Sequence, residues 1–127
     1  MARYDKYDGV AGGFRAEAAA AQAEANYDRP IGAGLDADGH VTTKAPGNSR
    51  FKGVTIVDRT KRRAGDILDI MTNGEIVDCD GLTAGTTYFL DANGELQTAE
   101  SEYYVGHTVE AWRLVVRFQD RTDLGAA

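Results

Sequence analysis

The sequence contains one cysteine, two prolines and two histidines in 127 residues. The single Cys79 excludes a disulfide within the chain. Its neighbours Asp78 and Asp80 should raise the pKa of its thiol, so we expect a structural cysteine and no reactive thiolate. The two histidines, His40 and His107, lie far apart, and no C-x-x-C or paired-histidine spacing occurs. The sequence therefore predicts neither a zinc site nor a cofactor.

Long apolar runs are also missing. No run approaches the ~18 residues that a membrane span needs. The N-terminus carries Asp5 and Asp8 and lacks the apolar stretch of a signal peptide. We therefore expect no membrane partner and folding in a cytoplasm.

Basic residues are scarce in the second half of the chain. The net charge of −6 divides into +3 for residues 1–63 and −9 for residues 64–127. Because binding to phosphates needs a basic face, nucleic acid is not an expected partner. The one basic cluster consists of Arg59, Lys61, Arg62 and Arg63. It is either a solvated loop or a contact with an acidic protein surface.

Motifs of enzymes and metal sites are absent or incomplete. There is no G-x-S-x-G, and neither Ser49 nor Ser101 stands in a nucleophile setting. Residues 36–39 (Asp-Ala-Asp-Gly) look like the start of a calcium loop, but Gly47 stands where an EF-hand needs its final Glu. The glycines of residues 9–13 lack the strand and the Lys-Ser/Thr of a phosphate loop. The sequence therefore predicts no enzyme and no metal site.

A short motif occurs twice in the chain. Residues 35–42 (Leu-Asp-Ala-Asp-Gly-His-Val-Thr) return at 90–98 (Leu-Asp-Ala-Asn-Gly-Glu-Leu-Gln-Thr), and a Gly-centred stretch and an apolar run follow each copy. Two copies spaced by 53 to 55 residues are too few for a solenoid. The repeat favours two half-units that close on each other in one small β-domain.

The chain from residue 30 to residue 119 carries the signals of strands. The dipeptides Asp38-Gly39, Asn73-Gly74 and Asn93-Gly94 are typical of two-residue hairpin turns. Without a βαβ pattern, the predicted fold is all-β, a small antiparallel barrel or sandwich, followed by a polar tail at 120–127. Alternation in the last strand predicts Trp112, Leu114, Val116 and Phe118 in the core. Nine strands are predicted, at Ile31–Leu35, His40–Thr43, Phe51–Val57, Asp66–Met71, Glu75–Asp80, Thr86–Asp91, Glu95–Thr98, Tyr103–Val109 and Trp112–Phe118.

The first 29 residues form a separate N-terminal arm in this interpretation. Seven alanines among residues 14–26 favour a short helix from about Arg15 to Ala25, although it has no large apolar face. The arm is a disordered tail or a segment that orders on a partner. Aromatic and arginine residues are enriched at binding hot spots, so the expected contact residues in the arm are Tyr4, Tyr7, Phe14 and Arg15. In the basic cluster, the expected contact residues are Arg59, Arg62 and Arg63.

The turn and glycine patterns resemble a known family. The segments 53–55 (Gly-Val-Thr), 64–67 (Ala-Gly-Asp-Ile), 73–76 (Asn-Gly-Glu-Ile), 83–86 (Thr-Ala-Gly-Thr) and 90–94 (Leu-Asp-Ala-Asn-Gly) are similar to those of head decoration proteins of tailed bacteriophages. These small β-domains are called β-tulips and are related in architecture to the lambda decoration protein. Residues 6–16 resemble the leading arm of decoration proteins from phages of actinobacteria.

The resemblance implies a function. A member of this family binds the outer surface of the assembled head, commonly as a homotrimer at local three-fold positions, and stabilises the shell. The implied partners are the major capsid protein and further copies of the chain. The implied location is the virion, after assembly in the host cytoplasm. A carbohydrate- or receptor-binding β-domain of a head fibre is the alternative, and it would need exposed aromatic side chains on a concave face. A small hydrolase is the third candidate.

Overall fold

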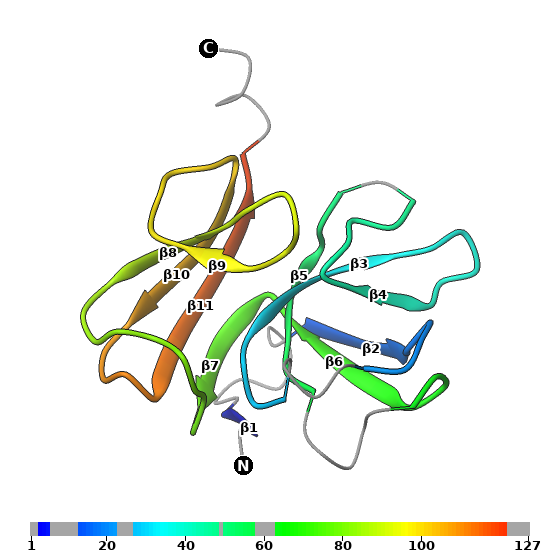
Figure 1. Cartoon of the computed structure of the whole chain (residues 1–127), viewed down its shortest axis with the longest axis horizontal. Helices are drawn as coiled ribbons and strands as arrows, with labels where there is room; N and C mark the ends of the chain where they lie inside the picture. The colour runs from blue at the N-terminus through cyan, green and yellow to red at the C-terminus, as the bar shows by residue number, and fades with distance from the viewer. Residues whose placement is uncertain (1–2, 6–12, 23–26, 49, 58–62, 122–127) are drawn as a thin grey trace.

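A computed structural model describes residues 3–5, 13–22, 27–48, 50–57 and 63–121, without the side chains of residues 3–5. The described chain is all-β and forms two antiparallel sheets (Figure 1). Sheet A has six strands in the order β1-β7-β11-β10-β8-β9, and sheet B has five in the order β2-β6-β5-β3-β4. The strands are β1 Arg3–Asp5, β2 Gly13–Glu17, β3 Ile31–Leu35, β4 Val41–Thr43, β5 Gly53–Thr55, β6 Ile67–Met71, β7 Asn73–Val77, β8 Thr87–Leu90, β9 Leu96–Gln97, β10 Tyr103–Thr108 and β11 Arg113–Asp120.

All nine predicted strands are present as β3 to β11, with ends that differ by a few residues. The sheets are not closed into a barrel, so of the two predicted architectures the barrel is wrong. In the described part of the chain there is no helix, and hence none that could cross a membrane.

The two sheets repeat one topology. Strands β2 to β6 lie in the order β2-β6-β5-β3-β4, and strands β7 to β11 lie in the order β7-β11-β10-β8-β9. Each strand of the first set therefore has a counterpart in the second. We call β2–β6 unit 1 and β7–β11 unit 2; β1 is an added edge strand of unit 2. The repeat seen in the sequence is thus part of a larger structural repeat.

The repeated motif folds in the same way in both units. Asp36 Oδ1 accepts hydrogen bonds from the backbone N–H groups of Asp38 and His40, at 2.9 Å each. Asp91 Oδ1 accepts the matching bonds from Asn93 and Glu95, at 2.8 and 3.0 Å. The glycine of each motif, Gly39 with φ 81° and Gly94 with φ 75°, has the left-handed conformation that the turn requires. Hairpin turns are therefore confirmed at both predicted places, but each loop has three residues and only its glycine has a positive φ, so the predicted two-residue type is wrong.

The third predicted turn, Asn73-Gly74, is wrong. Both residues belong to β7, and only Thr72 separates β6 of sheet B from β7 of sheet A. The Thr72 carbonyl accepts a hydrogen bond from the N–H of Phe118 in β11. The chain therefore crosses directly between the sheets, and the two units meet at this residue.

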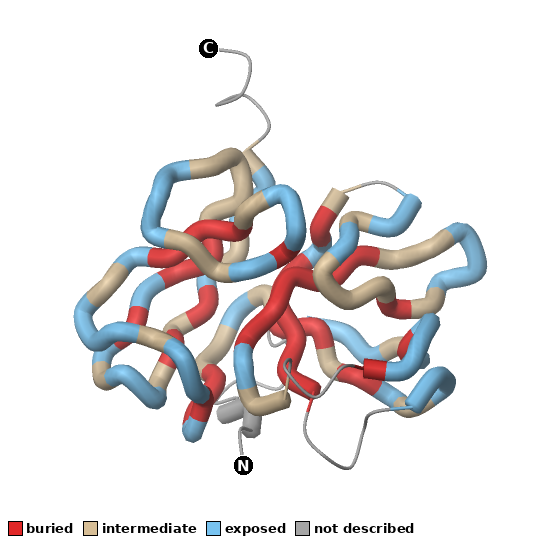
Figure 2. The backbone as a smooth tube through the Cα atoms, in the orientation of Figure 1, coloured by how far each residue is buried: buried red, intermediate tan, exposed pale blue. Residues whose placement is uncertain are grey.

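The two units pack head to tail, which means that the faces in contact are not equivalent faces of the two units. The main core combines one face of unit 1, with Phe51, Val54 and Met71, and the inner face of unit 2. The opposite face of unit 1 has its own core, which includes Leu68 and Ile70. Figure 2 shows buried residues concentrated where the sheets meet and exposed residues at the outer ends. The outer face of sheet A belongs to neither core, although Val77 and Phe89 on it are buried.

The strand β11 confirms the predicted alternation but not its first residue. Leu114 and Val116 are fully buried, and Phe118 is half-buried against the main core. Trp112 precedes the strand, in the β10–β11 turn, and is 48% exposed, so its prediction as a core residue is wrong.

The predicted helix from Arg15 to Ala25 is also wrong within the described residues. Residues 13–17 form β2, which pairs with β6, and residues 23–26 lie outside the described part. Ala18 is buried in the unit 1 core, and Gln22 accepts a hydrogen bond from the Thr43 hydroxyl at 2.6 Å. Pairing with an apolar strand outweighs the helix propensity of alanine because a lone short helix gains little in water.

Candidate functional site

The structure describes only part of the predicted contact residues. Tyr7, Arg59 and Arg62 lie outside the described residues, and Tyr4 belongs to β1 without a described side chain. Phe14, Arg15 and Arg63 are described and exposed. The first two are neighbours on β2, and the third stands in the loop before β6.

The strand β2 forms an edge of sheet B. Its residue Phe14 pairs with Ile70 of β6, and Phe14 remains 37% exposed. Arg15 Nε donates a 2.7 Å hydrogen bond to Asp69 Oδ1, while 74% of the Arg15 side chain is accessible. This salt bridge is exposed and contributes little stability, but it fixes the direction of the guanidinium.

Backbone groups of β2 point in two directions. The N–H of Ala18 bonds to the Asp66 carbonyl, so Ala18 faces the β6 side. The direction of the backbone N–H and C=O groups alternates along an antiparallel strand. Those of residues 14 and 16 therefore also point toward β6, whereas those of Arg15 point outward. Among the described residues, no strand pairs with the outward side at the N-terminal end of β2, so another strand can extend it there. Just beyond the C-terminal end of β2, the Ala19 N–H donates to the Val41 carbonyl of β4 at 2.9 Å, so the outward side is already paired at that end.

Arg63 lies next to the other end of β2. Its N–H donates to Asp66 Oδ2 at 3.0 Å, and the following Gly65 donates to the Ala18 carbonyl at 2.8 Å. The end of the loop that leads into β6 therefore lies beside β2. The matching connection in unit 2 needs only residues 109–112, whereas residues 56–66 connect β5 to β6 in unit 1.

Three potential metal ligands gather at the first repeated turn. Ligand atoms of Asp36, Asp38 and His40 all lie within 4.8 Å of one another. Backbone hydrogen bonds, above all the one from His40, lower the pKa of Asp36. Because Asp91 makes the same backbone bonds in the second turn, turn formation explains the carboxylate of Asp36.

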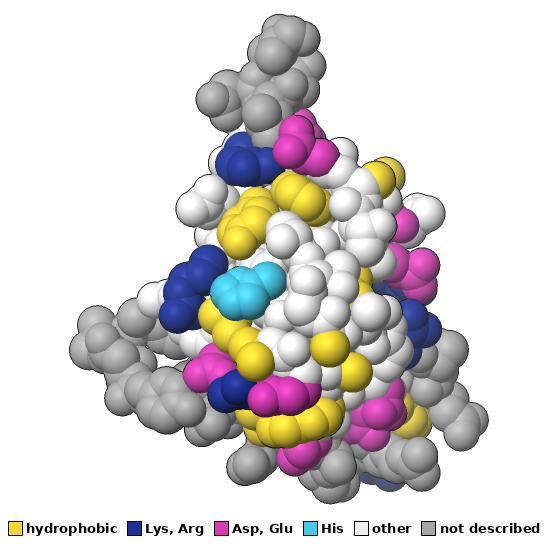
Figure 3. Space-filling view, turned by 90° about the vertical axis from the view of Figure 1, so that its left-hand side faces the viewer, with side chains coloured by type: hydrophobic (Ala, Val, Ile, Leu, Met, Phe, Trp, Pro, Cys, Tyr) yellow, Lys and Arg dark blue, Asp and Glu magenta, His cyan; other side chains and the backbone are white. Residues whose placement is uncertain are grey.

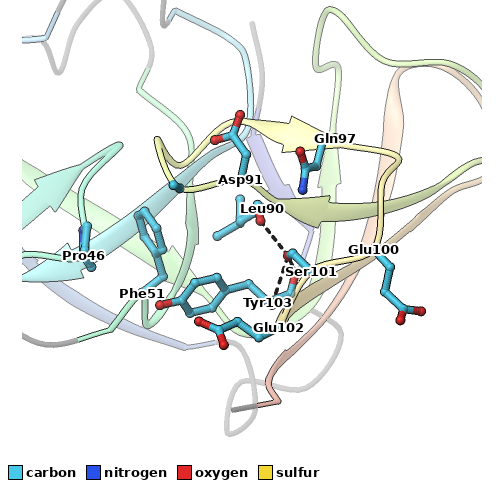
Figure 4. Close-up of a pocket in the computed structure, with 10 residues that line it drawn as sticks. Pro46, Phe51, Leu90, Asp91, Gln97, Glu100, Ser101, Glu102 and Tyr103 are labelled. Atoms are coloured by element: carbon cyan, nitrogen blue, oxygen red, sulfur yellow. Dashed lines mark hydrogen bonds between the residues drawn. The ribbon is translucent and has the colours of Figure 1, made fainter. Parts of the chain in front are cut away.

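A hollow of about 720 Å³ opens between the units, and Figure 4 shows the side chains that line it. Its floor is apolar and its rim is acidic; we call it the acidic hollow. Ion pairs with Asp120 and Glu102 raise the pKa of Arg50 beside it. In the described part of the chain Glu100 has no hydrogen bond or ion pair. The hollow is lined by Pro46, Phe51, Leu90, Asp91, Ala92, Gln97, Glu100, Ser101, Glu102 and Tyr103.

The aromatic rings of the acidic hollow are already in contact with other groups. The Arg50 guanidinium lies 4.6 Å from the centroid of the Tyr103 ring. The Tyr103 ring also meets the Phe51 ring edge-on and stacks on the Phe118 ring. The Ser101 hydroxyl donates to the Leu90 carbonyl at 2.7 Å. The hollow therefore suits a cationic group better than a sugar, which needs a free aromatic face, or a reaction that needs a free serine.

Sequence reasoning missed a basic, partly aromatic surface on the outer face of sheet A. In β11 the outward positions alternate with Leu114 and Val116, and this alternation was the signal that could have revealed them. Figure 3 shows this side of the molecule, with basic, acidic, histidine and apolar side chains together. We call it the arginine face, and it comprises Phe89, Tyr104, His107, Arg113, Val115, Arg117 and Arg121.

The three arginines of this face have different surroundings. Arg113 pairs with Glu110 at 2.8 Å and with Glu75 at 3.5 Å. Arg117 donates to backbone carbonyls and has no ion pair among the described residues. The guanidinium of Arg121 lies 5.6 and 5.5 Å from two ring centroids, those of Phe89 and Tyr104.

Comparison with known proteins identifies a fold. No protein-family model and no curated protein matches the sequence. A solved chain from Mycobacterium phage Patience has a similar structure, with a TM-score of 0.78 and 19% sequence identity. The match covers 94% of this chain and 96% of that chain. The protein described here therefore shares its fold, over nearly its whole length, with a protein of a mycobacteriophage.

Proposed function

We propose that the protein is a phage capsid decoration protein that binds the outer surface of the assembled head and stabilises it. The observation that carries this proposal is the near-complete match in fold to a mycobacteriophage chain of similar extent. It supports the phage side of the family resemblance, and the resemblance adds the decoration role. The proposed partners are the major capsid protein and further copies of this chain, in a homotrimer on the virion.

The proposed role is one of binding and not of catalysis. Among the described residues, the histidines lie with carboxylates or in solvent and not beside a nucleophile: His40 is 3.7 Å from Glu17 and 3.8 Å from Asp36. Stabilisation would follow from mass action, since a protein that binds the assembled shell and not its parts favours assembly.

The open edge of β2 is the proposed contact with the shell. It combines an exposed aromatic side chain, Phe14, an exposed arginine, Arg15, and an outward backbone edge. A strand of the shell can extend such an edge by β-augmentation, in which main-chain hydrogen bonds give affinity and side-chain pockets give specificity.

The first test is co-sedimentation of the full-length protein with expanded heads of its phage. We expect saturable coating and heads that resist heating better than bare ones. Failure to coat expanded heads at micromolar concentration would refute the decoration role.

The edge itself is tested by a matched pair of variants. Arg15→Pro removes the outward N–H together with the side chain, whereas Arg15→Ala removes only the side chain. Because proline is tolerated where an edge N–H faces solvent, both variants should fold. We expect coating to be lost with Arg15→Pro and weakened with Arg15→Ala. Equal coating by the two variants would place the shell contact elsewhere.

A second candidate function is glycan or receptor binding, and one observation favours it. Trp112 is 48% exposed beside Val109, which is 43% exposed, and exposed aromatic rings are what sugar binding requires. This surface is a hairpin turn and not the acidic hollow. A glycan array with the native protein and with Trp112→Ala separates this function from the first: binding lost with the tryptophan would support it.

A further inference from the structure

The arginine face is the counterpart of a surface that is buried in unit 1. Four paired positions run across sheet B in the row Gly32, Val54, Met71 and Gly13. Four positions in the same strand order run across sheet A in the row Thr87, His107, Val115 and Glu75. The central residues of the first row, Val54 and Met71, are fully buried against unit 2. Those of the second row, His107 and Val115, are exposed and half-buried.

Among the described residues, head-to-tail packing therefore occurs once and leaves one outer face without a partner unit. Unit 1 uses this face to cover the inner side of unit 2. Unit 2 presents the equivalent face, the arginine face, to the outside, with Val109 43% exposed at its end. Its equivalence to the face that unit 1 uses in the internal interface indicates that this face is suited to cover another protein surface.

The charge of the arginine face indicates the chemistry of that surface. All three basic residues of the acidic half 64–127 lie on it: Arg113, Arg117 and Arg121. Arg113 is paired there with Glu75 and Glu110, so Arg117 carries the accessible positive charge. In the described part of the chain, Nε and Nη2 of Arg121 are buried and have no hydrogen-bond partner. Because these atoms are buried, they are not accessible to a second molecule. Arg117 is exposed and has no ion pair among the described residues, so its guanidinium is available to a carboxylate.

The chain itself supplies carboxylates of the required kind on its other side. The acidic hollow carries Asp91, Glu100 and Glu102. Glu102 already pairs with Arg50 at 2.6 Å, and Asp91 Oδ1 accepts two backbone hydrogen bonds, so Glu100 is the carboxylate without a partner among the described residues. The hollow lies on the inner side of sheet A, where Leu90 and Tyr103 join the main core. Because the two surfaces lie on opposite faces of one sheet, one molecule cannot join them, but two copies can.

We propose that the arginine face of one copy binds the acidic hollow of a second copy, head to tail. This contact deepens the proposed function by naming the surfaces through which copies associate. Such a heterologous contact closes into a ring when the rotation between copies allows it. Paired charges of this type set register and association rate, so the contact weakens with salt.

Sedimentation velocity of the full-length protein, from about 1 to 500 µM and at low and high salt, tests the contact. The native protein should associate at low salt and dissociate as salt rises. Arg117→Glu and Glu100→Arg should each raise the dissociation constant about tenfold or more. A mixture of these two variants should associate again, because each supplies one intact surface. Arg117→Gln, which removes the charge without reversing it, should give a smaller loss.

Two control variants and one independent assay complete the test. Arg63→Glu and Asp38→Arg reverse exposed charges outside both surfaces and should associate like the native protein. A native protein that stays monomeric at low salt, or a mixture that fails to associate, would overturn the proposal. Coating of heads is measured separately, so a monomeric protein that still coats heads refutes this contact and leaves the decoration role standing.

Discussion

Truncation of the N-terminus gives a quantitative test of β2. A deletion of residues 2–16 removes the pairs Phe14–Ile70 and Ala16–Leu68. By strand alternation these pairs account for about four backbone hydrogen bonds, each contributing about 1 kcal/mol. Leu68 and Ile70, both fully buried, would also lose part of their cover, at a cost of about 1–2 kcal/mol. The same deletion removes β1, at a further cost of about 2 kcal/mol. The free energy of unfolding should therefore fall by about 7 kcal/mol.

The size of this loss decides the outcome, because small domains have a total stability of about 5–15 kcal/mol. If residues 1–29 formed a separate arm, as expected from the sequence, the deletion would hardly change stability; we expect a large loss instead. A deletion of residues 2–12 is the matched control. It removes β1, which has three paired residues, and should cost only about 2 kcal/mol.

Equilibrium urea unfolding followed by far-ultraviolet circular dichroism measures both deletions. The longer deletion should have a clearly lower midpoint than the shorter one. If the two free energies of unfolding agree within about 1 kcal/mol, β2 does not support the core of unit 1 and the reasoning is refuted. In either case, loss of head coating by the longer deletion cannot by itself identify a contact, so point variants at Arg15 are required.

Further predictions concern single residues. Leu114→Ala should lower the free energy of unfolding by about 2–5 kcal/mol. Trp112→Ala, at a half-exposed position, should lower it by less than about 1 kcal/mol. Equal losses in chemical denaturation would contradict the burial pattern. Gly106→Ala should prevent folding, because a Cβ there would lie against the Val115 carbonyl oxygen. Gly39→Ala should still fold, because the added Cβ has open space and only the positive φ causes strain. Circular dichroism of the two purified variants compares them. Burial, followed by the charges of its acidic neighbours, raises the pKa of Cys79 to about 11, so its thiol should react with a disulfide reagent at pH 8 at least a hundredfold more slowly than an exposed thiol. Since the thiol of an unfolded chain ionises near pH 8.5, the stability gained from the protonated thiol should decrease from that pH up to about 11, and fast labelling of the folded protein would disprove the burial.

Much of the fold was predictable because its signals are local. The Asx-Gly turns around Asp36 and Asp91 depend on a few adjacent residues, and they placed the hairpins correctly. The acidic neighbours of Cys79 correctly predicted the direction of its pKa shift, although burial is the larger cause.

The errors came from positions that depend on distant parts of the chain. The strand β2 has an alanine-rich continuation that favours a helix by propensity, and only its pairing with β6 makes it a strand. Asn73-Gly74 has the composition of a turn, yet it continues into β7 because the chain changes sheets at Thr72. The arginine face requires the register of four strands, which no single stretch of sequence contains.

The repeated topology has a consequence for how the chain evolved. A duplication of one five-stranded unit, followed by divergence, would leave matching residues where the backbone imposes the same demand and differing residues where the surroundings differ. The first kind is found at Asp36 and Asp91, whose carboxylates hold identical turns. The second is found at Val54 and His107, which occupy equivalent positions, one against the sister unit and one facing water. The backbone requirements of the turns therefore preserve the sequence similarity of the two units, while the residues on their surfaces have diverged.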